Sequence, residues 1–284
     1  MASIAVSGHD TINPPPAALR VSYSTGRMLG VEDFQAEQDY HRGRLARALM
    51  SLHGTGTVVG LNVTTDNNTD LSQLEIQVAP GIAIDRVGRI LDVQVTVCIR
   101  PQAWLAQQTD SDLILAYKSN SYILVDVFAA FAACTRGKTP CFATQDDYDA
   151  TDAFSANRTL DSFAMQLVLR TDANPLLPKD PWLSEGAPPA GGTAPTAAEL
   201  TAIKQSILSA TPVPAQTAPQ EYPLLADTTS VFLARIEIAA TQAGAGQRPV
   251  ADLTKITIDN QSRLFVLPTM LLARWAGLGF GQEM

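Results

Sequence analysis

The sequence is short of charged residues, of cysteine and of long apolar runs, and each shortage excludes a class of protein. Charged side chains make up 17% of the 284 residues, whereas about 25% is usual in a globular domain. A surface so poor in charge suits contact with other proteins, so we expect much of it to face protein partners. The net charge is −8 and no run of Lys and Arg occurs, which argues against a nucleic-acid partner.

No stretch approaches the roughly 18 apolar residues of a membrane span. The longest apolar stretch, YILVDVFAAFAAC, is interrupted by Asp126. The first 20 residues lack the basic and apolar regions of a secretory signal. The sequence therefore predicts a protein that is made in the cytoplasm and does not insert directly into a membrane.

Three cysteines are too few for a disulfide framework. Cys134 and Cys141 enclose a short loop, TRGKTP. They could form a disulfide under oxidising conditions or remain as two reduced thiols, and the sequence leaves both open. No third thiol or histidine lies near them in the sequence, so we expect no zinc site, no other metal site and no cofactor.

Proline and glycine divide the chain into four parts. Residues 1–20 read as an extended arm, because the run NPPP cannot be helical. Residues 21–171 are predicted to form a helix plus an antiparallel β core. Residues 172–223 contain ten of the 18 prolines and form a Pro/Ala/Gly-rich excursion with one short helix near 196–209, capped by Thr196 and Glu199. Residues 224–284 are predicted to be returning strands and an apolar C-terminal segment.

The strongest helical signal covers residues 31–52. Apolar and related positions fall on one stripe at steps of three, four and seven: Val31, Phe34, His41, Leu45, Ala48, Leu49 and Leu52. Acidic residues begin this segment and arginines end it, which complements the helix dipole. Gly54 stands where a left-handed residue would end the helix.

Alternating apolar residues predict strands after the helix. Three segments carry the pattern first: TVVGLNV, LEIQVAPGIAID and RILDVQVTVCI. The sequence DRVG is predicted to be a tight turn in which Gly88 has positive φ. Further strands are expected at 121–131, 161–170, 230–240 and 253–259. The fold class predicted is α+β, mainly antiparallel β, with one long N-terminal amphipathic helix and a Pro/Ala-rich excursion.

The glycine-rich stretch SLHGTGTVVGLNV has the wrong order for a phosphate loop. Phosphate loops run from strand to helix, whereas here a helix precedes the glycines and no Lys follows. Gly54 and Gly56 are therefore expected to serve backbone geometry, and Gly60 to allow close packing. His41 is expected to pack on the helix stripe, and His53 to meet the last helix carbonyls.

No catalytic constellation is predicted. A G-x-S-x-G elbow is missing from the sequence. The acidic run at 144–152 lacks the spacing of an EF-hand loop, so a solvated loop is expected there, with loose calcium binding as the alternative.

Two segments, YSTGRMLGVEDFQAEQDYHRGRLARALMSLHGTGTVVGLNV and VAPGIAIDRVGRILDV, resemble a pattern of contractile phage tails and phage-tail-like injection systems. The family pattern often has Thr before the helix, where this chain has Gly30, and Gly also caps helices acceptably. The signature positions carried by the resemblance are Tyr23, Gly26, Phe34, Gln38, Tyr40, His53, Gly54, Gly56, Gly60, Leu61, Pro80, Gly81, Asp85, Gly88 and Arg89.

The resemblance implies a structural protein at the baseplate periphery or at the attachment of fibres or accessory proteins, without enzymatic activity. Its partners would be baseplate, sheath or fibre components, and it would be a homo-oligomer within an assembled particle, with release from the cell left open. The interface candidates are Pro14, Pro15, Pro16, Leu271, Leu272, Trp275 and Phe280.

Two other functions remain as alternatives. One is a glycan- or cell-surface-binding module of a tail particle, although only 6% of the residues are aromatic. The other is a hydrolase that acts during injection, which the missing acid/base pair makes the weaker of the two.

Overall fold

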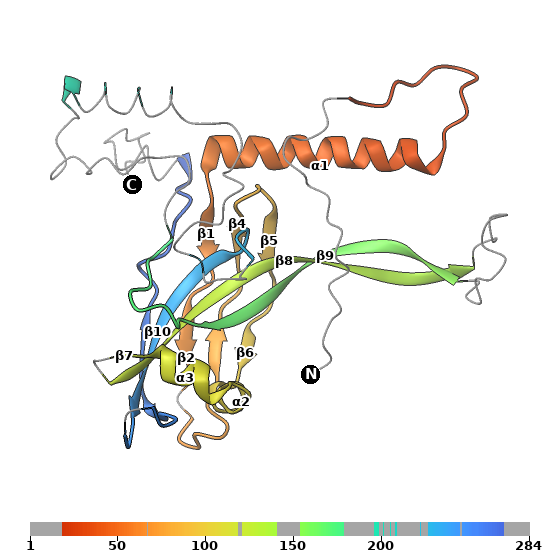
Figure 1. Cartoon of the computed structure of the whole chain (residues 1–284). Coiled ribbons are helices and arrows are strands. Elements are labelled where there is room, and N and C mark those ends of the chain that lie inside the picture. Colours follow the sequence, from red (N-terminus) through yellow and green to blue (C-terminus); the bar gives the residue numbers. More distant parts are fainter. Residues whose placement is uncertain are drawn as a thin grey trace, which may run out of the picture.

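A computed structural model describes residues 19–66, 68–118, 121–140, 154–178, 227–244 and 246–269, with positions 196–198, 201, 205, 208 and 222. Helix α1 (Val31–His53) lies across one end of a body of antiparallel strands (Figure 1). The mixed α+β class with an N-terminal helix is therefore confirmed. No helix in the described parts of the chain is long and apolar enough to cross a bilayer.

Helix α1 begins and ends where the sequence predicts. The side chain of Asp33 accepts a hydrogen bond from the backbone N–H of Gly30 at 3.0 Å, and this is one half of a capping box. At the other end Gly54 has φ 75°, and its N–H donates to the carbonyl of Met50 at 2.9 Å. The expected positive φ at Gly54 is confirmed.

Most of the predicted stripe of α1 does not face the body; only Leu45 and Leu49 line a hollow with residues of the 85–89 turn and Phe131. The residues that α1 buries are Gly43, Ala46 and Met50. On the stripe, Phe34 is 52% exposed and Leu52 is 77% exposed. The packing role expected for His41 is wrong, because its side chain is 71% exposed and lies 4.0 Å from Glu37. The residue at the closest approach, Ala46, is small because the helix backbone there lies against the turn that contains Gly88.

Three successive segments of the chain each contribute one strand to each of two small sheets. The first sheet contains β1 (Gly56–Gly60), β4 (Gly81–Ile84) and β5 (Ile90–Val93). The second contains β2 (Val63–Thr65), β3 (Ile76–Val78) and β6 (Val97–Ile99). Each of the three segments with a strand signal is thus divided between two sheets, and the expectation that RILDVQVTVCI forms one strand is wrong. Val95, at the break between β5 and β6, is 65% exposed and so does not continue the buried alternation of Leu91 and Val93.

The first break depends on a close backbone approach at Gly60. Gly60 has φ 68° and the buried Leu61 has φ 56°, so the chain turns sharply between β1 and β2. A Cβ atom at Gly60 would lie 2.1 Å from the carbonyl oxygen of Pro80. The N–H of Leu61 donates to that same oxygen at 3.2 Å. The close packing expected of Gly60 is confirmed.

A larger sheet is built around one long strand, β8 (Tyr122–Pro140). Its order is β11 (Val250–Asp259), β10 (Val231–Thr241), β8 and β7 (Tyr117–Lys118). Strand β9 (Phe154–Leu169) pairs with β8 along the edge that β7 leaves open, from Val125 onward. The four strands expected here are confirmed, and β8 and β9 continue beyond the body as a hairpin (Figure 1).

The main core lies between the large sheet and the small sheets. Alternate residues of β8, including Val125 and Val127, pack in one cluster with Val63, Val78 and Leu91. The opposite face of the large sheet is buried as well, where Phe128, Phe232 and Tyr222 form a second cluster. Burial on both faces explains why β8 reads as a nearly continuous apolar run instead of an alternating one.

Two short helices precede β7, and the sequence reasoning missed both. Helix α2 (Pro101–Ala106) begins with proline at its first position. Helix α3 (Asp110–Ala116) is capped by Thr109, whose side chain accepts from the N–H of Asp112 at 3.1 Å. Both are too short for a clear helical period.

In the excursion, positions 197, 198, 201, 205 and 208 are helical, in line with the predicted short helix, whereas Glu199 lies outside the described residues.

Replacing Gly60 by valine tests the close approach. We expect Gly60→Val to lose more than about 3 kcal/mol of unfolding free energy, because both the positive φ and the contact with Pro80 oppose a side chain. The matched control is Gly26→Ala, since Gly26 also has positive φ but nothing within 4 Å of its Cβ position. The control should lose only about 1–2 kcal/mol. Equal losses in urea denaturation would contradict the steric explanation.

Candidate functional site

The turn at residues 85–89 is a part of the signature that is held by several internal hydrogen bonds. The fully buried carboxylate of Asp85 accepts from the N–H of Val87 at 3.0 Å and of Arg89 at 2.8 Å. It also pairs with the Nε of Arg89 at 2.5 Å. Gly88 has φ 90°, as predicted. Burial raises the pKa of Asp85 while the charge of Arg89 opposes the rise. The three hydrogen bonds to this carboxylate hold the turn in one shape.

The 85–89 turn joins four elements. A Cβ atom at Gly88 would lie 1.9 Å from the carbonyl oxygen of Ala46, so α1 rests directly on the turn. Arg89 donates to the hydroxyl of Thr229 at 2.8 Å, and its guanidinium lies 4.7 Å from the ring centroid of Phe131 in β8. The turn therefore connects α1 and the β4–β5 hairpin to the large sheet.

A second connection holds the break between β1 and β2. Arg263 is 6% exposed and donates to the carbonyl of Leu61 at 2.7 Å and of Asn260 at 2.9 Å. The side chain of Asn260 exchanges two hydrogen bonds of 2.9 Å with the backbone of Val63. Burial lowers the pKa of Arg263 to about 10, so the guanidinium stays charged at neutral pH and stabilises the break.

The outer face of the large sheet carries a buried charge cluster, formed by Asp126, Arg170 and Arg235. Asp126 and Arg170 are both fully buried and lie 2.6 Å apart. Arg235, directly opposite Asp126 in the β8–β10 ladder, donates to both carboxylate oxygens at 2.8 and 3.0 Å. Two guanidinium groups therefore share one carboxylate, and Asp172 supplies a further one to Arg170 at 2.9 Å.

The charge cluster fixes the segment that follows β9. Arg235 donates to the carbonyls of Pro175 at 3.0 Å and Leu176 at 3.1 Å. Lys118 donates to the carbonyl of Asp172 at 2.6 Å, and burial lowers the pKa of this lysine. The sequence reasoning missed the cluster. A signal was present, since Asp126 interrupts the longest apolar run, but its partners lie 44 and 109 residues away.

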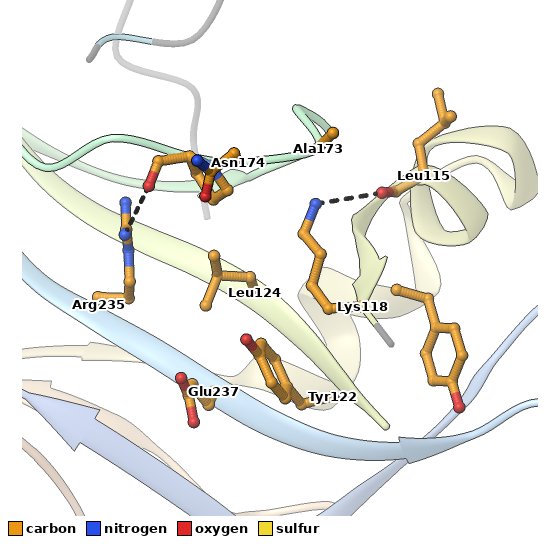
Figure 2. A pocket seen from close by; sticks show the side chains of 10 residues that line it. Leu115, Lys118, Tyr122, Leu124, Ala173, Asn174, Arg235 and Glu237 are labelled. Carbon is orange, nitrogen blue, oxygen red and sulfur yellow. Dashed lines mark hydrogen bonds between the residues drawn. The ribbon is translucent and has the colours of Figure 1, made fainter. Parts of the chain in front are cut away.

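A hollow of 420 Å³ lies beside the charge cluster. Lys118 and Arg235 stand on opposite sides of it, with Leu124 between them (Figure 2). Tyr122 and Glu237 also line the hollow. Its volume is within the roughly 300–1,000 Å³ usual for small-ligand sites, and its charged lining suits a polar ligand.

The signature residues before and within α1 are mostly exposed. Tyr23 is 55% exposed, and its hydroxyl donates to Glu37. Gly26 has φ 82° in a turn, and Phe34, Gln38 and His53 lie on exposed positions of α1. The expected contact of His53 with the last carbonyls stays a prediction. The structure thus brings together the signature positions from Gly54 to Arg89 and leaves the earlier ones at the surface.

Several predicted features fall outside the described residues. These are the interface candidates Pro14, Pro15, Pro16, Leu271, Leu272, Trp275 and Phe280, the acidic run 144–152, and Cys141. The pairing of Cys134 with Cys141 and the role of the two terminal segments therefore stay predictions. Within the described ranges, no three His, Cys, Asp or Glu side chains gather as metal ligands would.

The comparisons with known proteins give weak structural likeness and no match in sequence. No protein-family model and no curated protein matches the sequence. Among solved structures, a crystal structure of TssK matches at 14% identity with a TM-score of 0.29. The alignment covers 56% of this chain and 36% of the TssK chain. A likeness at this level gives no information on function.

Replacing Asp126 by asparagine tests the charge cluster. We expect Asp126→Asn to lose about 3–5 kcal/mol of unfolding free energy, because two guanidinium groups would lose the buried carboxylate they share and Arg170 would keep only the partly exposed Asp172. The control is Lys255→Ala, which removes an exposed ion pair of 3.4 Å with Asp252 and should cost less than about 1 kcal/mol. A loss below that level for Asp126→Asn in urea denaturation would contradict the assigned role.

Proposed function

We propose that this chain is a structural, non-enzymatic subunit of a contractile phage-tail-like particle. It would lie at the baseplate periphery or attach fibres or accessory proteins. The observation that carries the proposal is the resemblance of residues 23–63 and 78–93 to proteins of such particles. The 85–89 turn agrees with a structural role, because its carboxylate and guanidinium are both engaged in holding backbone and neighbouring strands.

The β8–β9 hairpin supports a role in assembly. Beyond Ala133 its described side chains become exposed, and the two strands project away from the body (Figure 1). An isolated two-stranded hairpin is only marginally stable in water. Packing against a neighbouring subunit would stabilise this arm, which we define as residues 134–140 and 154–161.

Co-sedimentation tests the proposal. An epitope-tagged chain would be expressed together with the sheath, tube and spike genes of its own genomic neighbourhood. We expect the tag to travel with intact particles in a density gradient, and immunogold labels to gather at one end of each particle. A tag that remains in the slow fractions, or the absence of such genes nearby, would contradict the proposal.

Two matched substitutions test the arm. Leu160 on the arm is 43% exposed, and Leu115 on α3 is 58% exposed. We expect Leu160→Asp to reduce incorporation into particles by about tenfold or more, whereas Leu115→Asp leaves it unchanged. Both variants should keep the circular dichroism of the parent. Equal incorporation of the two variants would remove the arm from the assembly interface.

The hollow favours one second candidate, a glycan-binding module. Its lining combines aromatic Tyr117 and Tyr122 with charged Lys118 and Glu237, which is a suitable chemistry for stacking on a sugar and bonding its hydroxyls. If this function holds, a glycan array should show binding that Tyr122→Ala abolishes. An array without binding would leave only the structural role.

A further inference from the structure

The exposed stripe of α1 has the spacing of a coiled-coil seam. Steps of three and four residues alternate over three heptads, through Val31, Phe34, Gln38, His41, Leu45, Ala48 and Leu52. Every one of these seven positions is exposed. Val31, Leu45 and Leu52 are 67%, 56% and 77% exposed, and large apolar side chains at this spacing are typical of a helix that packs against another helix.

The seam points away from the body except at its margin, where Leu45 is 56% exposed but also lines a small hollow with Gly88 and Phe131. The three buried residues of α1, Gly43, Ala46 and Met50, occupy the opposite side of the heptad from the seam positions. Ala46 is also the residue whose carbonyl rests on Gly88. One face of α1 is therefore fixed on its own chain while the opposite face is available to a second helix.

The charges on α1 select the direction of that second helix. Its first half carries four acidic residues: Glu32, Asp33, Glu37 and Asp39. Its second half carries three arginines: Arg42, Arg44 and Arg47. A parallel copy would place like charges side by side. An antiparallel copy places the acidic half against the basic half, and the two helix dipoles then point in opposite directions, which is favourable.

We propose that α1 pairs with α1 of a second copy of this chain in an antiparallel coiled coil. Antiparallel layers then join Val31 to Ala48, Phe34 to Leu45 and Gln38 to His41 of the second copy. The polar layer of Gln38 and His41 fixes the register, because any shift would bury one of these groups against an apolar side chain. The pairing is isologous, so each contact occurs twice.

Glu37 and Arg44 flank the seam and lie opposite each other across this pair. In the single chain Glu37 accepts from Tyr23, and Arg44 lies 5.4 Å from the ring centroid of Tyr40. Both side chains remain at the surface, with 38% of the Glu37 side chain exposed. The pairing depends on α1 alone and holds whether or not the chain belongs to a tail-like particle.

Sedimentation velocity and light scattering of the full chain test the proposal. The wild type should form dimers at micromolar concentration. Phe34→Glu and Leu45→Glu should each raise the dimer dissociation constant by about tenfold or more. Val95→Glu is the control, since Val95 is as exposed but far from α1 in the sequence, and it should dimerise like the wild type. Unchanged circular dichroism excludes unfolding.

A charge exchange tests the direction of the pair. Glu37→Arg alone and Arg44→Glu alone should both be monomeric, because each puts like charges at the two symmetric contacts. A mixture of the two variants should form a heterodimer, and the double variant should form a homodimer again. A monomeric wild type, a trimer, an effect of Val95→Glu equal to that of the seam variants, or a mixture that stays monomeric would each overturn the proposal.

Discussion

The buried carboxylate of Asp85 is the interaction on which the rest of the arrangement depends. By holding the amides of Val87 and Arg89 it gives the β4–β5 turn one fixed shape. That shape places Gly88 beneath α1 and extends Arg89 to Thr229 and Phe131. A helix with only three buried residues has little apolar contact of its own, so its position follows from the turn.

The large sheet is buried on both of its faces. One face packs on the small sheets, and the other carries Asp126 with two arginines. A buried ion pair adds little net stability over apolar packing, because desolvation offsets the attraction. The geometry that the ion pair requires is strict, however, and Arg235 also donates to the carbonyls of Pro175 and Leu176. The cluster thereby determines where the chain runs after β9.

The exposed elements are those that suit assembly. The outward face of α1 and the β8–β9 arm both have many exposed side chains, and both lie at the margins of the body (Figure 1). The interior, in contrast, contains the apolar core, glycines at close approaches, and the ion-paired carboxylates of Asp85 and Asp126. Such a division is expected of a rigid part whose function is to contact its neighbours.

Local features of this protein were determined by the sequence alone. Capping, turn chemistry and apolar runs act within a few residues of the chain. They are enough to predict the ends of α1, the positive φ at Gly54 and Gly88, and the strands on either side of β8. Three other features were decided only by the tertiary structure. These are the outward direction of the α1 stripe, the division of three apolar segments between two sheets, and the partners of Asp126. Periodicity identifies the apolar face of a helix or strand but not what covers that face. The ion pairs of Asp126 join residues 44 and 109 positions apart, so they form only when the strands have been brought side by side.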